Sequence, residues 1–375
     1  MKWIRKALTE LRIVTYHRGF LPKKTVEKAF GDPGCRKEIV EKWEKSHPGA
    51  ARKLAAMTDR AMASAPADET GRGKYITDLK YYYYAYGFYP YEFANYHLDS
   101  RTEEESRAFI PNMELAEKAY RMNDIKAMAL FRDKGLTYKL FKDFFHRECI
   151  LVESRKDFAA FQDYVSRHPV FVKKQINGSY GSSVKRVDAT ACMDQLQEMF
   201  DSIIREGKHI IEEVIVQSKE LAAFNASSVN TVRCATILTR QGPEIAFSVL
   251  HTGRKGSFVS NEGAGGVQAG IDIATGELNT VWIDEKNRRY DAHPDSGVPY
   301  AGSRLPDWEG LVRTCKEAAV IAGGKGCRYV GWDMAHTAEY GWVMVEGNGS
   351  GQLVGIQTTT QKGIRTDFEA LMSRI

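Results

Sequence analysis

Two apolar runs near the C-terminal end of the sequence are typical of a β-hairpin: Tyr329-Val330-Gly331-Trp332-Asp333-Met334-Ala335 and Trp342-Val343-Met344-Val345-Glu346-Gly347-Asn348-Gly349. Because side chains alternate along a strand, Glu346 and Asn348 share one face. If the turn centres on Glu339 and Tyr340, Asp333 lies opposite Glu346 on the partner strand. The sequence therefore predicts that two carboxylates and an amide converge at one point of a sheet.

Three such side chains are costly in an apolar hairpin unless a cation neutralises them, because burial disfavours the charged form of a carboxylate. Hard oxygen ligands that leave room for phosphate oxygens are typical of a Mg²⁺ site. We therefore assign Asp333, Glu346 and Asn348 to a metal site. The alternative is an exposed polar rim on an edge strand, which needs no metal.

A second region joins a strand to a flexible loop, and its order is Pro169-Val170-Phe171-Val172-Lys173-Lys174, then Asn177-Gly178-Ser179-Tyr180-Gly181-Ser182-Ser183. Glycines let the backbone approach a ligand, and serine hydroxyls with exposed N–H groups can cradle phosphate oxygens. Lys173 or Lys174 supplies a cation beside this loop. The Walker pattern is absent and a strand follows the loop, so this is not a P-loop. An ordinary glycine-serine hairpin tip remains the alternative.

A third region is an apolar strand that leads into an extended hinge, Ile210-Ile211-Glu212-Glu213-Val214-Ile215-Val216-Gln217, with Glu220 beyond it. The backbone of Glu213, Val214 and Ile215 is free to bind the edge of an adenine, and Glu220 is placed to accept hydrogen bonds from ribose hydroxyls. Taken alone, the region reads equally as a buried strand with a solvated acidic end.

Arg233 lies at the start of a further strand, where a guanidinium can steady a transferring phosphoryl group or a substrate carboxylate. A surface arginine is the alternative. The glycine-rich segment 260–270 is interpreted as a mobile active-site loop, with a simple connection as the alternative.

The composition indicates a globular protein with room for two domains: 375 residues, 43% hydrophobic and 27% charged. A net charge of +5 is too small to argue for nucleic acid and suits an anionic small molecule. The six cysteines form no C-x-x-C pair, which favours reduced thiols in a cytoplasmic protein. The sequence shows no signal peptide and no long apolar run. Residues 1–18 are basic and amphipathic, suited either to weak contact with an anionic membrane surface or to packing on the domain itself.

The order of elements predicts an α+β fold. Residues 1–115 form a mostly helical region, 116–220 a linker helix with a small nucleotide-binding lobe, and 221–375 a large catalytic lobe with the metal site. The tyrosine-rich segment 81–93 of the helical region suits a packing interface, or alternatively a stacking surface for bases or sugars. Strands are expected at 149–153, 170–174, 184–187, 210–216, 231–239, 245–252, 329–335 and 342–346.

Taken in order, these motifs resemble the ATP-grasp superfamily, over roughly Asn123 to Ile375: a lysine before the small lobe, a lysine with a glycine-serine loop, a Glu-Glu hinge with a glutamate beyond it, and Asp followed by Glu-x-Asn. Asn230-Thr231-Val232-Arg233, the glycine-rich loop and Gly331-Trp332-Asp333 narrow the resemblance to the sugar-transfer-associated ATP-grasp proteins. Tyr86-Gly87-Phe88-Tyr89-Pro90-Tyr91-Glu92-Phe93 is similar to that group's helical N-terminal part.

The resemblance implies two lobes that clasp ATP and a role for each motif. Lys126 corresponds to the first nucleotide-phosphate lysine, with Lys134 as a rival, and Lys173 to the second, with Lys174 adjoining it. The cofactor-binding set is Lys126, Lys173, Lys174, Gly178, Ser179, Gly181, Ser182, Ser183, Glu213, Val214, Ile215 and Glu220. The metal set would hold Mg²⁺, usually two ions, with Mn²⁺ as a substitute.

The implied activity is that of an ADP-forming carboxylate–amine ligase that works through an acyl phosphate, with Arg233 and Lys173 as catalytic residues and small-molecule carboxylate and amine substrates. The group's name associates it with surface-glycan pathways. Two alternatives stay open: a phosphotransferase that acts on a hydroxyl, and a non-catalytic nucleotide-binding scaffold. The sequence identifies neither the substrates nor the oligomeric state.

Overall fold

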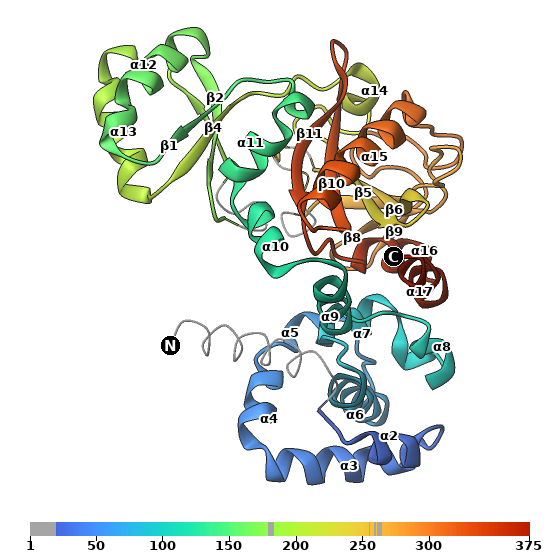
Figure 1. Cartoon of the computed structure of the whole chain (residues 1–375). Coiled ribbons are helices and arrows are strands. Elements are labelled where there is room, and N and C mark those ends of the chain that lie inside the picture. The colour runs from blue at the N-terminus through green and yellow to red at the C-terminus, as the bar shows by residue number, and fades with distance from the viewer. Residues whose placement is uncertain (1–19, 179–183, 255, 259, 261–264) are drawn as a thin grey trace. The chain divides into compact units, whose positions relative to one another are not determined.

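The structure is a computed structural model, and it describes residues 20–178, 184–254, 256–258, 260 and 265–375 (Figure 1). The amphipathic segment 1–18 lies outside the described residues. The chain divides into two compact units: Met1–Arg121 with Gln352–Ser373, and Met122–Gly351 with Arg374 and Ile375. We call them the helical unit and the two-lobed unit. Within the described ranges, no helix is both long and apolar enough to cross a membrane.

The helical unit contains α2 (Lys23–Ala29), α3 (Pro33–Ser46), α4 (Pro48–Ala55), α5 (Asp59–Met62), α6 (Glu69–Tyr86), α7 (Pro90–Asn95), η1 (Leu98–Ser100), α8 (Glu103–Arg107), α9 (Asn112–Met122), α16 (Val354–Thr360) and α17 (Arg365–Ser373). The last two helices come from the C-terminal end of the chain. Arg365 on α17 pairs with Glu114 on α9, at 2.7 Å between Nη2 and Oε2. The chain therefore returns to this unit after completing the other one.

The tyrosine-rich segment forms the C-terminal half of α6 and continues into α7. The helix ends at Gly87, whose φ of 80° is a left-handed conformation that glycine adopts at little cost. Tyr81, Tyr82, Tyr83 and Tyr84 are at most 2% exposed, so their rings belong to the core of the unit. The structure thus agrees with the packing interpretation of these tyrosines.

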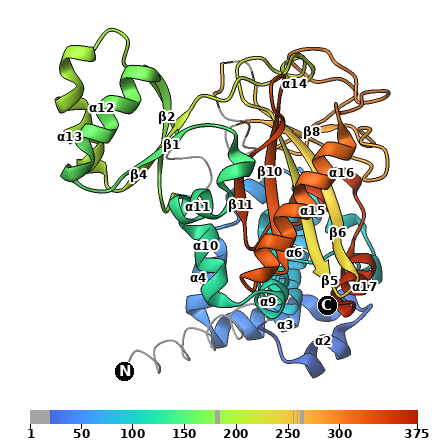
Figure 2. The same cartoon turned by 45° about the horizontal axis from the view of Figure 1, so that its top comes forward.

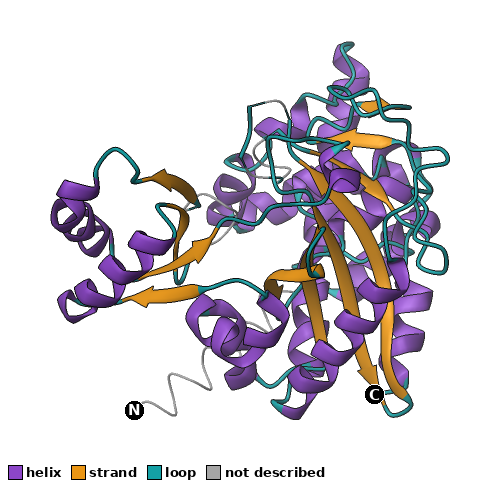
Figure 3. Ribbon diagram, turned by 90° about the horizontal axis from the view of Figure 1, so that it is seen from above, coloured by secondary structure: helices purple, strands orange, loops and turns teal. Residues whose placement is uncertain are grey.

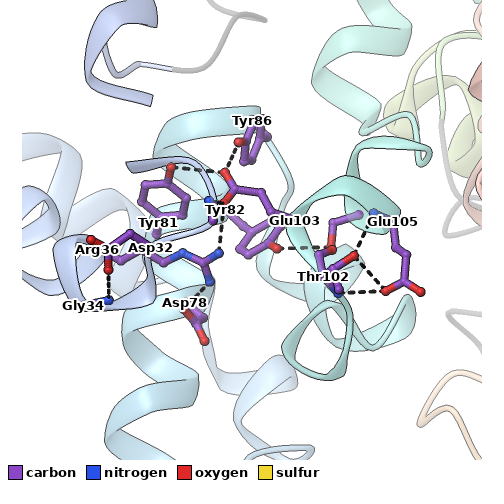
Figure 4. Close-up of polar contacts among 12 residues, drawn as sticks. Asp32, Gly34, Arg36, Asp78, Tyr81, Tyr82, Tyr86, Thr102, Glu103 and Glu105 are labelled. Carbon is purple, nitrogen blue, oxygen red and sulfur yellow. Dashed lines mark hydrogen bonds and ion pairs between the residues drawn. The ribbon is translucent and has the colours of Figure 1, made fainter. Parts of the chain in front are cut away.

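A buried ion cluster, the Arg36 cluster, ties α3, α6 and α8 together (Figure 4). Arg36 donates to Asp78 at 2.8 Å and to Glu103 at 3.0 Å. The hydroxyls of Tyr81 and Tyr86 donate to the other oxygen of Glu103. Each carboxylate therefore has a cation or a hydroxyl donor, which offsets the cost of burying the charges.

The small lobe of the second unit contains β1 (Cys149–Val152), η2 (Arg155–Asp157), α12 (Phe158–Arg167), β2 (Val170–Gln175), β3 (Lys185–Asp188), η3 (Met193–Gln195), α13 (Leu196–Glu206) and β4 (His209–Glu213). The four strands form an antiparallel sheet in the order β1-β4-β2-β3. Both helices pack on one face, around Phe161, Phe171 and Phe200. The helix α10 (Ile125–Arg132) and the helix α11 (Lys134–Phe145) precede this lobe.

The large lobe contains α14 (Lys219–Ala222), β5 (Thr231–Thr239), β6 (Gly242–Thr252), β7 (Val267–Gly270), β8 (Trp282–Asp284), β9 (Arg289–Tyr290), α15 (Trp308–Gly324), β10 (Tyr329–Thr337) and β11 (Gly341–Asn348). Its seven-stranded antiparallel sheet has the order β11-β10-β5-β6-β7-β8-β9. Figure 2 shows α15 lying along β5, β6 and β10, and Figure 3 shows the strands of the two sheets as separate groups. The ATP-grasp expectation of two α+β lobes is met.

The expected strands all form, with small shifts at their ends. The main difference concerns the glycine-rich segment: residues 267–270 are not loop but strand β7, which pairs with β6. Short strands rich in glycine carry no clear alternation of apolar and polar side chains, so the sequence pattern did not show this one. Residues 261–264 of the same segment lie outside the described part of the chain.

Candidate active site

The two carboxylates of the expected metal site lie directly opposite each other on β10 and β11. Asp333 pairs with Glu346, which confirms the register expected from the sequence. Nearer the turn the register is different, because Met334 pairs with Met344. An extra residue, Val345, therefore forms a β-bulge between the two registers. Without it Asp333 would face Val345, and Glu346 would point to the other face of the sheet.

Arg233 on β5 completes a row across three neighbouring strands. It pairs with Asp333 in the sheet, and its Nε and Nη2 atoms donate to the two carboxylate oxygens at 2.5 and 2.6 Å. Burial opposes the charged form of Asp333, but the adjacent Arg233 guanidinium outweighs it and lowers the pKa of the carboxyl group. Asp333 is therefore ionised, and Arg233 neutralises it.

Glu346 has no such partner. Among the described residues, no lysine or arginine forms an ion pair with its carboxylate. Burial and the negative charge of Asp333 raise its pKa, and the more distant Lys134 and Lys174 only partly compensate. Asn348 reaches both acids, with its amide nitrogen 3.3 Å from Asp333 Oδ2 and 3.4 Å from Glu346 Oε1. A half-buried carboxylate without its own cation, beside a second acid and an amide, fits a divalent cation with oxygen ligands.

In the described part of the chain, no group of three or more histidine, cysteine, aspartate or glutamate side chains is placed to hold a metal ion. The proposed site is of another kind, because its ligands are two acids and one amide. The Asn348 amide must rotate to present its oxygen to an ion, and amide orientation is an assignment rather than a fixed feature.

Lys174 and Lys134 are the lysines that act on Glu346 electrostatically. Lys174 on β2 bonds to Glu212 on β4 at 2.9 Å, and Arg147 bonds to the same oxygen at 2.8 Å. Arg147 also donates to the carbonyl of Met344, directly before the bulge, at 2.6 Å. These contacts connect the cationic side of the small lobe to the strand that carries Glu346.

Lys134 is the first residue of α11, where Asp133 caps the helix. It is half-buried, and burial together with the charge of Lys174 lowers its pKa, while Glu346 and Glu212 act in the opposite direction. Its ammonium group donates to the carbonyl of Gly178, the last described residue at the start of the glycine-serine loop expected to bind the nucleotide. Ser179, Gly181, Ser182 and Ser183 lie outside the described residues.

The structure does not bring Lys173 or Lys126 to this row. Because side chains alternate along β2, Lys173 shares the face of Phe171, which packs against the helices, and bonds to Glu206 on α13 at 2.8 Å. Lys126 is exposed near the start of α10, and its ammonium group bonds to none of the described residues. Lys174 and Lys134, the neighbour and the rival in the sequence, are the lysines near Glu346.

The hinge residues Glu213 to Ile215 lie where the chain leaves β4 of the small lobe and runs to the large lobe. Glu213 ends β4 and shares two contacts with Glu148: its amide donates to the Glu148 carbonyl, and its carboxylate accepts from the Glu148 amide. Val214 and Ile215 follow, and their backbone groups form no hydrogen bond with any described residue. Glu220 is exposed on α14, and Ser218 just before that helix donates to the His336 carbonyl at 2.7 Å, near the end of β10.

A comparison with known families decides the assignment. The family profile described as sugar-transfer associated ATP-grasp matches residues 116–372. The chain belongs to this family. The match begins within α9 and includes both lobes, so every residue of the row lies inside the ATP-grasp region.

Solved structures with a similar fold are ATP-grasp ligases of low sequence identity. The ligase PsnB, complexed with a minimal precursor, is 12% identical over 70% of this chain and 69% of its own, with a TM-score of 0.43. D-alanine-D-alanine ligase from Coxiella burnetii is 9% identical over 67% and 59%, with a TM-score of 0.40. N5-carboxyaminoimidazole ribonucleotide synthetase (purK), in its ADP complex, is 11% identical over 66% and 53%, with a TM-score of 0.41. A search of curated proteins by sequence finds no match.

The sequence did not single out several residues of the candidate site, or offered them only as second choices. Arg147 carries no motif, and Glu212 was named only as part of the Glu-Glu hinge, because their pairing joins two distant segments. Lys134 had a local signal: Asp133 directly before it is a helix-capping residue, which places the lysine in the first turn. On β2, Phe171 lies two residues before Lys173 and indicated that Lys173 is on the core face. Val172 is equally apolar and lies two residues before Lys174, so the sequence left the two faces ambiguous.

Proposed function

We propose that this ATP-grasp protein is an ATP-dependent, ADP-forming ligase that joins a carboxylate to an amine through an acyl phosphate. The observation that carries the proposal is Glu346, a carboxylate that forms no ion pair with a described lysine or arginine, lies opposite Asp333 and is within the electrostatic influence of Lys134 and Lys174. Such a combination of acids and lysines suits a metal–triphosphate group, because the ion neutralises the acids and the phosphates neutralise the lysines.

In this proposal Asp333, Glu346 and Asn348 hold one or two Mg²⁺ ions, with Mn²⁺ as a substitute. Bound there, the metal would draw charge from the phosphate oxygens and hold the γ-phosphate in line for attack. Lys134 and Lys174 take the phosphate-binding roles that the resemblance gave to Lys126 and Lys173. Adenine lies against the hinge Glu213 to Ile215, and Glu220 accepts hydrogen bonds from the ribose.

Arg233 neutralises the negative charge that otherwise keeps the two reactants apart. Its Nη1 atom forms no hydrogen bond with a described residue, so it remains free to receive a carboxylate or a phosphate oxygen. A carboxylate oxygen then attacks the γ-phosphorus, and the bond to the ADP oxygen breaks. An amine attacks the resulting acyl carbon, forms the amide, releases phosphate and loses one proton to solvent. Exclusion of water protects the acyl phosphate between these two steps.

The test is Mg²⁺-dependent release of ADP by the full-length protein with pooled amino acids, uronic acids and amino sugars. Hydroxylamine is then added in place of the amine, because it converts an acyl phosphate into a hydroxamate. We expect ADP and hydroxamate in equal amounts. ADP release without hydroxamate, together with a phosphorylated hydroxyl compound, would identify a phosphotransferase instead. Nucleotide binding without any turnover would favour the scaffold.

A further inference from the structure

The sheet face that carries Arg233 and Asp333 continues across β6 and β7. Residues of β5 and β6 on the opposite face, such as Val232, Cys234 and Leu250, are fully buried, and α15 packs there. On the Arg233 face, Thr231, Arg233 and His251 are half-buried, whereas Val249 and Gln268 are buried. The part of this face around Arg233 and His251 is therefore less covered than the opposite face.

Three polar residues, which we call the polar row, lie side by side on this face. Thr231 on β5 pairs with His251 on β6, and His251 pairs with Gln268 on β7. Residues that pair across antiparallel strands project on the same side, so all three share the face of Arg233, which is two residues from Thr231. Gln268 lies two strands from Arg233, or about 10 Å across the sheet.

Gln268 is 0% exposed, and neither the nitrogen nor the oxygen of its amide has a hydrogen-bond partner. A buried amide that lacks both partners destabilises the fold, because neither polar group regains the hydrogen bonds that it makes with water in the unfolded chain. Nothing in the packing of β7 requires an amide, since a leucine has nearly the same volume and no polar atoms. The missing donor and acceptor are what a bound ligand would supply.

The groups around Gln268 indicate what kind of ligand this is. Burial and the nearby Arg233 lower the pKa of His251 to about 4, so its ring is neutral at physiological pH. No described residue forms a hydrogen bond with that ring. The hydroxyl of Thr231 lies 3.2 Å from the hydroxyl of Ser260. The row thus presents uncharged donors and acceptors, with a guanidinium at one end only.

We propose that the polar row binds the neutral, hydroxyl-bearing part of the carboxylate substrate, whose carboxylate meets Arg233. A substrate ammonium group is disfavoured here because the polar row contains no acid and Asp333 is already paired with Arg233. A second carboxylate is disfavoured because Thr231, His251 and Gln268 bring no charge to balance it. This inference rests on the proposed function, since it names the substrate class of the same site.

The test uses four six-carbon carboxylates that differ in one property: gluconate carries hydroxyls, hexanoate carries none, adipate has a second carboxylate and 6-aminohexanoate has an ammonium group. Full-length protein is first titrated with ADP and Mg²⁺, and each carboxylate is then added at saturating ADP. Thermal melting and calorimetry report binding. Gluconate should raise Tm by about 2–4 °C and bind at least about tenfold more tightly than the other three, which is about 1.4 kcal/mol in binding free energy.

The informative variant is Gln268→Leu. Without ligand its Tm should be equal to or above that of the wild type, because an unsatisfied amide has been removed. Its affinity for gluconate should fall about 10- to 100-fold, while its affinity for ADP with Mg²⁺ stays unchanged. Thr358→Val in the helical unit is the matched control: it also removes a buried hydroxyl that has no partner, and it should leave gluconate binding as in the wild type. If Gln268→Leu fails to fold, Thr231→Val replaces it, with a smaller loss in the same direction.

Three outcomes would overturn the inference: equal binding of hexanoate and gluconate, unchanged gluconate binding in the foldable row variants, or binding of none of the four carboxylates by protein that binds ADP. Failure to bind ADP with Mg²⁺ would instead contradict the proposed function. The two failures are therefore distinguished within the same experiment.

Discussion

Two clusters of this protein each combine one arginine with two acids, but they differ in how completely the acids are neutralised; in the first, Lys74 also pairs with Asp78 at 2.8 Å. In the Arg36 cluster of the helical unit, the guanidinium is shared between Asp78 and Glu103, and tyrosine hydroxyls complete the second acid (Figure 4). In the large lobe, Arg233 gives both of its bonds to Asp333, and Glu346 opposite has no cation.

The difference separates a structural cluster from one that is suited to a ligand. A complete cluster gains nothing from an additional ion, so its residues contribute to folding alone. An incomplete cluster stores an electrostatic cost that a divalent cation can relieve. The pKa of Glu346 is raised because of this missing charge. Variants in either cluster therefore show whether folding or catalysis depends on it.

The largest effect is expected for Arg36→Met, which leaves Glu103 buried without a cation and Asp78 with only the more exposed Lys74. The free energy of unfolding should fall by about 3–5 kcal/mol, as for other broken buried ion pairs. Urea unfolding of the variant measures this loss. If the protein tolerates the change with less than about 1 kcal/mol of destabilisation, the Arg36 cluster is not the complete structural cluster described here.

Glu346→Gln should act in the opposite way. The rate of ADP release should fall by about 10²–10³-fold, as for removal of one electrostatic stabiliser of a transition state. The free energy of unfolding should stay equal or rise, because the amide removes a repulsive charge beside Asp333. Glu339→Gln, the same substitution at the exposed turn of this hairpin, is the control and should retain full activity. A loss of stability without loss of ADP release would make Glu346 structural.

The two adjacent lysines of β2 allow a matched pair of variants. Lys174→Met should lower kcat/KM for ATP by about 10- to 100-fold, since a charge-assisted bond to phosphate is worth roughly 1.5–3 kcal/mol. Lys173→Met should change it less than about threefold, because Lys173 bonds to Glu206 on the helix face of β2, opposite the face that carries Lys174. The reverse order of effects would return the catalytic role to Lys173, the residue that the sequence favoured.

The smallest effect is the pH dependence of stability caused by Glu346. Its pKa in the folded protein lies above the ordinary value of 4.5, so in that range the folded state binds more protons than the unfolded one. The free energy of unfolding therefore falls as pH rises from 4.5 through the raised pKa, by at most about 1.4 kcal/mol per pH unit.

Comparison with Glu346→Gln isolates this contribution, because the amide does not titrate. Urea unfolding across this pH range should show the variant gaining on the wild type with rising pH, and adding Mg²⁺ should reduce the gap. A constant difference at all pH values would mean that the carboxylate is already neutralised inside the protein.

How far the sequence determined this picture differs between its parts. A turn centred on Glu339 and Tyr340 predicted that Asp333 and Glu346 meet. They do meet, but the hairpin turns about Glu339 alone, since Thr337 pairs with Gly341, and the bulge restores the expected pair. The bulge at Val345 that makes this possible has no sequence signal, because a bulge depends on the pairing of both strands. On β2, Phe171 and Val172 are both apolar, so the sequence did not show which of the adjacent Lys173 and Lys174 shares the core face. Arg147 and Glu212, far apart in sequence, become neighbours only when the sheets form.

The central claim is that Asp333, Glu346 and Asn348 together hold a divalent cation that grips the nucleotide phosphates. The most direct test is a crystal structure with Mn²⁺ and a non-hydrolysable ATP analogue, in which anomalous scattering locates the ion. The account predicts a Mn²⁺ peak within coordination distance, about 2.0–2.4 Å, of oxygens from Asp333 and Glu346 and of a phosphate oxygen. A nucleotide bound elsewhere, or an ion with no ligand from Glu346, would contradict it.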